Sequence, residues 1–86
     1  MIKLWAKIIK KDKIIQQITY ESIDTYSDET FYLHVSELCH KLDIPSPIVL
    51  KTHIKQFKTY GNTTFILRDW VENINFDKLV VENIGK

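Results

Sequence analysis

The chain has 86 residues, of which 44% are hydrophobic, 12% aromatic and 27% charged, and its formal net charge is +1. This size suits one domain spanning residues 1–86, and the two glycines and two prolines exclude a linker-rich or disordered chain. A single cysteine excludes an intramolecular disulfide and zinc-finger spacing. Without a segment resembling a signal peptide or a transmembrane helix, we expect a cytoplasmic protein that has no membrane partner.

The first twenty residues are predicted to form a β-hairpin. Apolar residues alternate along the first strand, and a second β-rich run follows the polar cluster at residues 10–13. A three-residue loop would place Leu4 opposite Ile18, with the apolar residues of both strands on one face. A two-residue loop would place Leu4 opposite Thr19. The apolar pattern therefore predicts the three-residue loop.

Two helices are predicted after the hairpin. Ser27 is a good N-cap for the first helix, which runs to about Leu42 with an apolar stripe at helical spacing. The linker at residues 43–47 contains two prolines, which end that helix. Ser46 can cap the second helix, which runs to about Tyr60 and ends at a glycine.

Two more strands are predicted, over residues 63–67 and 79–84, with Asp69 capping a short helical turn between them. The resulting order is ββααββ. It predicts an α+β fold in which a four-stranded, mostly antiparallel sheet is covered on one face by the helical pair.

Charge alternates along the chain. Residues 1–13 carry five lysines against one aspartate, a sum of +4, and residues 14–50 carry one lysine against six acids, a sum of −5. Residues 51–68 return to +4 through three lysines and one arginine, and residues 69–86 sum to −2 from two lysines against four acids. The alternation fits elements that complement their neighbours, and it also fits a polyanion site.

One face of the hairpin presents a tryptophan among lysines. Because Leu4 and Ile8 turn inward, Trp5 and the neighbouring lysines point to the opposite face. That face can anchor a protein partner or a second copy of the chain, stack on bases, or be covered by another element of the chain. We hypothesise a non-enzymatic protein-interaction module that uses this face. The residues of the predicted partner surface are Trp5, Ile9, Ile15, Lys3 and Lys7.

Residues 36–57 resemble the helix-turn-helix of bacterial transcription factors. Small and apolar residues occupy positions around the turn that let two helices cross closely, although Asp43 stands where glycine is usual. The resemblance implies a recognition helix over about 46–60, and DNA binding is the alternative function. The residues implied to contact DNA are Lys51, Thr52, Lys55, Gln56 and Lys58.

Catalytic and metal-binding patterns are not found in the sequence. The spacings of His34, Cys39 and His40 scatter them around the first predicted helix instead of converging on one side. Adjacent helical residues point about a hundred degrees apart, so the Cys39-His40 pair is no dyad. The GxSxG, glycine-rich phosphate-loop and HExxH patterns do not occur. We therefore predict no enzyme activity, no metal and no cofactor.

Three segments together resemble a group of small uncharacterised proteins of Firmicute bacteria. They are KLWAKIIK at residues 3–10, DIPSP at 43–47 and FDKL at 76–79. The resemblance implies a complete bacterial domain. It implies no activity, cofactor or catalytic residue.

Overall fold

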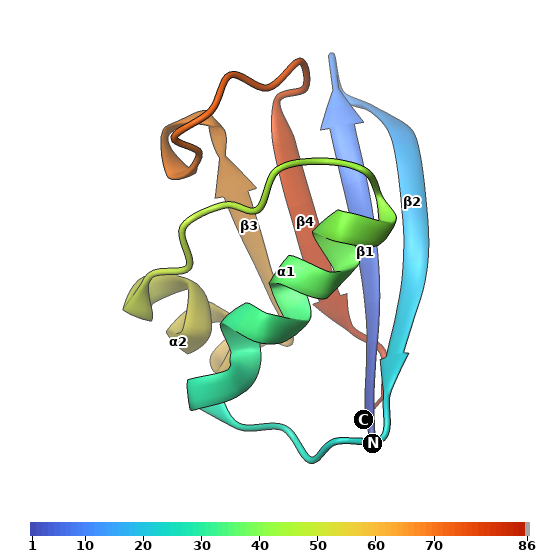
Figure 1. The fold of residues 1–86 in the computed structure, drawn as a ribbon, viewed down its shortest axis with the longest axis vertical. Helices are drawn as coiled ribbons and strands as arrows, with labels where there is room; N and C mark the ends of the chain where they lie inside the picture. The colour runs from blue at the N-terminus through green and yellow to red at the C-terminus, as the bar shows by residue number, and fades with distance from the viewer. Residues whose placement is uncertain (86) are drawn as a thin grey trace.

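Four antiparallel strands form one sheet, and both helices pack on the same face of it (Figure 1). The computed structural model describes residues 1–85. The strands are β1 (Ile2–Lys10), β2 (Lys13–Ser22), β3 (Asn62–Ile66) and β4 (Lys78–Asn83), and the helices are α1 (Phe31–Lys41) and α2 (Lys51–Tyr60). The strand order β2-β1-β4-β3 leaves β2 and β3 at the edges. The predicted ββααββ order and four-stranded sheet are confirmed.

The core fills the space between the sheet and the helices. Burying each of its large apolar side chains stabilises the fold by about 1.5–3 kcal/mol. No helix in residues 1–85 is long and apolar enough to cross a membrane. The buried residues include Ile2, Leu4, Ala6 and Ile8 from β1, Leu79 and Val81 from β4, and the predicted stripe of Phe31, Val35, Leu38 and Leu42.

The register of the hairpin differs from the predicted one. The turn has two residues, Lys11 and Asp12, which both adopt positive φ, at 51° and 64°. A β-bulge then adds one residue to β2, so Leu4 pairs with Tyr20 and not with Ile18. The bulge restores the face alternation that a two-residue turn alone would reverse, so Ile18 and Tyr20 still face the core.

The first helix agrees with the prediction, whereas the second begins later. Ser27 Oγ accepts the N–H of Glu29 at 3.2 Å ahead of a 3-10 turn, and α1 gives way to its C-cap at Leu42. Residues 44–50 are not helical, and α2 begins at Lys51. The prediction that Ser46 caps the second helix is wrong, because the linker is bonded to the segment after β3 and stays out of helical geometry.

Contacts with the segment after β3 hold the linker in place. Trp70 Nε1–H donates to the carbonyl oxygen of Pro45 at 2.8 Å, and the N–H of Ile48 donates to the carbonyl oxygen of Asp69 at 2.7 Å. The 3-10 turn in this segment spans Leu67–Asp69. Asp69 therefore ends the turn that it was predicted to begin.

Candidate functional site

The predicted partner surface around Trp5 lies on the sheet face opposite the helices. Trp5 Nε1–H donates to Gln17 Oε1 at 2.8 Å, and Lys7 Nζ lies 4.0 Å from the centroid of the indole ring. Lys7 Nζ also lies 3.7 Å from Glu82 Oε1. The indole N–H of Trp5 and the ammonium group of Lys7 therefore both have partners within the same face, and the indole ring itself is half-buried.

The structure brings together most, but not all, of this predicted surface. Lys3 shares the face, and its Nζ lies 3.5 Å from Glu21 Oε1. Ile9 of β1 pairs with Ile14 of β2. Ile15 is the bulge residue and has no partner in the register, so it stands outside the regular rows. Trp70 does not cover Trp5, because Trp70 is buried against Phe65 and Phe76 in the core.

The residues implied to contact DNA lie on α2 and are exposed, but they do not form a helix-turn-helix. Residues 42–50 separate the two helices, far more than the short turn of that motif, and α2 packs along β3 (Figure 1). Lys58 Nζ lies 3.1 Å from Asp28 Oδ2, and Gln56 Oε1 accepts the hydroxyl of Thr63 at 2.9 Å. The predicted recognition helix over 46–60 is therefore wrong in its start and in its setting.

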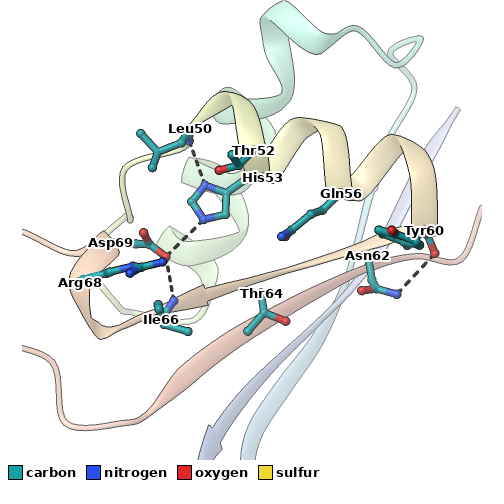
Figure 2. A pocket seen from close by; sticks show the side chains of 10 residues that line it. All are labelled: Leu50, Thr52, His53, Gln56, Tyr60, Asn62, Thr64, Ile66, Arg68 and Asp69. Atoms are coloured by element: carbon teal, nitrogen blue, oxygen red, sulfur yellow. Dashed lines mark hydrogen bonds and ion pairs between the residues drawn. The ribbon is translucent and has the colours of Figure 1, made fainter.

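A groove of about 690 Å³ runs between α2 and the edge strand β3 (Figure 2). Because α2 is tied to the inner face of β3 through Gln56, the groove opens along the strand's outer edge. One end of the groove is formed by Leu50, Arg68 and Asp69. The helix lines it with Thr52, His53, Gln56 and Tyr60, and the strand lines it with Asn62, Thr64 and Ile66.

Unpaired backbone groups of β3 face this groove. In an antiparallel pair of strands, residues that exchange hydrogen bonds alternate with residues that do not. Asn83 N–H donates to the carbonyl oxygen of Gly61 at 2.6 Å, which assigns these two residues to the bonded set. Asn62, Thr64 and Ile66 therefore direct their N–H and C=O groups away from β4, and these are the β3 residues that line the groove. Asp69 Oδ2 accepts the N–H of Ile66, so within residues 1–85 the outward N–H groups that stay open are those of Asn62 and Thr64.

The two edges of the sheet are protected to different degrees. Natural edge strands avoid unwanted pairing through charges, prolines and bulges. The edge strand β2 has a bulge and carries Lys13 and Glu21. The other edge strand, β3, reads NTTFI and has no charge, no proline and no bulge. The groove therefore lies along the unprotected edge.

Exposed apolar side chains stand at both ends of the groove. Leu50 is 49% exposed and Ile66 is 39% exposed at one end, and Tyr60 is 71% exposed at the other. Apolar and aromatic side chains next to an open strand edge are the contacts that a bound peptide can bury. The groove thus offers both hydrogen-bonding groups and apolar contacts.

A buried pair holds the end of the groove together. His53 Nδ1 accepts the N–H of Leu50 at 2.9 Å, so the imidazole proton lies on Nε2 and is donated to Asp69 Oδ2 at 3.2 Å. The same carboxylate oxygen accepts the N–H of Ile66 at 2.9 Å. With both ring nitrogens engaged and the ring buried, His53 positions the wall and is not available as a base.

No protein-family model, curated protein or solved structure matches the chain. The resemblance to small Firmicute proteins therefore stays a prediction. Sequence reasoning overlooked the groove, because His53 and Asp69 gain their roles from contacts between α2 and the turn after β3. His53 stands three residues after Leu50, the N-cap of α2, which is the spacing at which a side chain bonds back to the N-cap N–H. That spacing would have indicated the role of His53 if the start of α2 had been known.

The remaining histidine and cysteine candidates lie apart from the groove. Cys39 is fully buried, and burial raises the pKa of its thiol to about 12, so it stays protonated and unreactive. His34 Nδ1 lies 2.9 Å from the hydroxyl oxygen of Tyr20, while His40 is exposed. Within residues 1–85, no three His, Cys, Asp or Glu side chains are grouped so as to hold a metal ion.

The Tyr20 hydroxyl gives the fold a dependence on alkaline pH. It donates to Glu37 Oε2 at 2.6 Å, and burial together with that carboxylate raises the pKa of Tyr20 to about 12. The folded state favours the neutral phenol, whereas an unfolded tyrosine ionises near pH 10. Stability is therefore fully present below about pH 10 and falls as the pH rises toward 12. Urea unfolding on both sides of this window measures the fall.

The variant Tyr20→Phe provides the control for this prediction. It removes the titrating hydroxyl and keeps the ring, so its stability should start lower at neutral pH but decline less between about pH 10 and 12. An equal decline in both proteins would show that other groups cause the alkaline loss.

Proposed function

We propose that the chain is a protein-interaction domain that binds an extended segment of a partner protein by adding it to the sheet beside β3. The observation that carries the proposal is the groove that opens onto the unpaired N–H and C=O groups of Asn62 and Thr64, on an edge without charge, proline or bulge. In this mode of binding, main-chain hydrogen bonds supply affinity and the neighbouring wall selects side chains.

The charge of α2 favours a partner over a second copy of the chain. The helix forms one wall of the groove and carries Lys51, Lys55 and Lys58 without any acidic residue. Pairing of β3 with β3 from a second copy would bring two such helices toward each other, and like charges oppose that approach. The expected interaction module is therefore retained, but its binding surface moves from the Trp5 face to the groove.

Strand addition is tested by a titration of the isotope-labelled protein with a short capped peptide of alternating valine and threonine, followed by NMR. We expect shifts at the amides of β3 and the facing side of α2, and slower hydrogen exchange at Thr64. Thr64→Pro removes an outward N–H and should weaken binding about tenfold or more. Shifts confined to the Trp5 face would instead support the surface predicted there.

A matched control lies on the other edge of the sheet. Ile84 N–H donates to the carbonyl oxygen of Lys3, so alternate β1 residues, including Trp5, bond to β4. Thr19, which pairs with Trp5, therefore directs its N–H away from β1. Thr19→Pro introduces the same change as Thr64→Pro at the protected edge and should leave binding unchanged. Equal losses in both variants would contradict binding at β3.

A further inference from the structure

Resting on the proposed function, we infer that the groove selects an acidic segment, whose carboxylates lie between Arg68 at one end and Lys55 along the helical wall. Arg68 lines the groove itself. Lys55 borders a hollow that it shares with Thr52, Gln56 and Tyr60, which also line the groove. The cations therefore flank the path that an added strand would follow.

These cations are available to a ligand. Arg68, Lys51 and Lys55 are exposed, and none of them forms an ion pair within residues 1–85. Lys58, on the same helix, is already paired with Asp28. The cations nearest the groove are thus the ones that an incoming carboxylate can neutralise, at little desolvation cost because they stand at its rim.

The one acidic side chain among the residues that line the groove is not exposed at its rim. Asp69 is buried, and its Oδ2 accepts hydrogen bonds from the N–H of Ile66 and from His53 Nε2. Its charge is therefore stabilised inside the protein and does not face an incoming strand. The charged side chains that are exposed along the rim, Arg68 and Lys55, are both positive.

The pleat of an added strand sets the positions of the carboxylates. Successive side chains of a strand point to opposite faces of the sheet, so every second residue of the segment would face the α2 wall. Those positions meet Thr52 and Gln56 with Lys55 beside them, and the end of the groove presents Leu50 and Ile66 near Arg68. The expected ligand therefore has acidic residues at alternate positions and an apolar residue at the Leu50 end.

Three capped peptides of the same length test this inference: alternating glutamate and valine, alternating glutamine and valine, and alternating lysine and valine. We expect the glutamate peptide to bind about tenfold tighter than the glutamine peptide, and the lysine peptide to bind more weakly than either, because each rim charge contributes about threefold. The preference should shrink as salt is raised.

Charge reversal sharpens the experiment. In the double variant Lys55→Glu with Arg68→Glu, the lysine peptide should become the tightest ligand. The control is Lys10→Glu with Lys13→Glu, which makes the same change in net charge at the exposed hairpin end, on strands that β4 separates from β3. If both double variants invert the preference equally, the effect comes from net charge and the inference is overturned.

The remaining outcomes separate this inference from the proposed function. Equal affinities for the glutamate and glutamine peptides, both abolished by Thr64→Pro, would overturn the acidic preference and leave strand addition standing. If no peptide shifts the β3 amides, the proposed function is overturned with it. A duplex DNA oligonucleotide that binds through Lys51 and Lys55 and is unaffected by Thr64→Pro, while the peptides fail, would assign the positive rim to nucleic acid.

Discussion

Replacing Phe65 with alanine is expected to lower the free energy of unfolding by about 3–5 kcal/mol. The ring is fully buried, its centroid lies 4.3 Å from that of His53, and it meets Trp70 edge-on at 6.3 Å. It therefore joins β3 to both α2 and the segment after the strand. A chain of this length has a total stability of about 4–13 kcal/mol, so the variant should lose much of its stability. Urea unfolding followed by circular dichroism measures the loss.

The neighbouring residue supplies the control for this variant. Ile66 follows Phe65 in β3, points to the other face and is only partly covered. Ile66→Ala should therefore cost less than about 1 kcal/mol. Similar losses in the two variants would contradict the placement of the core on the helix side of β3.

Asp69→Ala is expected to cost about 3 kcal/mol. Its carboxylate accepts hydrogen bonds from the N–H of Ile66 and from His53 Nε2, and alanine leaves both donors buried without an acceptor. Because His53 also accepts the N–H of Leu50, the start of α2 should loosen as well. Thermal unfolding gives the loss of stability, and hydrogen exchange at the Ile66 and Leu50 amides locates it.

Asp69→Asn separates the hydrogen bonds from the space that the side chain fills. Asparagine keeps an acceptor oxygen at the same distance from the backbone, so the variant should cost about 1 kcal/mol and preserve slow exchange at Ile66. A loss as large as that of alanine would mean that the charge of Asp69, and not its role as an acceptor, holds the turn.

The element order and the core could be predicted because they rest on local periodicity. The alternation along β1 and the helical spacing of Phe31, Val35 and Leu38 fix which faces are buried before any long-range contact is known. The hairpin register could not be obtained in this way. A tight turn and a bulge each shift the pairing by one residue, and together they preserve the face alternation on which the prediction depended.

The start of α2 depends on contacts that the linker sequence does not contain. Ser46 and Pro47 favour a helix start locally, but the linker bonds to Trp70 and to the backbone of Asp69, more than twenty residues along the chain. These bonds keep residues 44–50 out of helical geometry. Local propensity was therefore overridden by tertiary contacts.

The groove could not be predicted because it follows from strand order. The apolar pattern of β3 does not reveal whether the strand lies at an edge or in the middle of the sheet. It lies at an edge only because β4 pairs with both β1 and β3. The lysines of α2, including Lys55, could be identified from the charge pattern of the sequence. That they stand beside an edge strand could be known only from the order of the strands in the sheet.

The central position of β4 also constrains how a newly made chain folds. The β1–β2 hairpin and β3 share no hydrogen-bonded contact with each other, and both pair with the strand that is synthesised last. The four-stranded sheet therefore cannot close until residues 78–83 have been made and are free to pair, and until then the apolar faces of the hairpin and β3 stay apart. Pairings this distant in sequence are formed slowly, so the nascent chain passes through a period in which a chaperone can bind it.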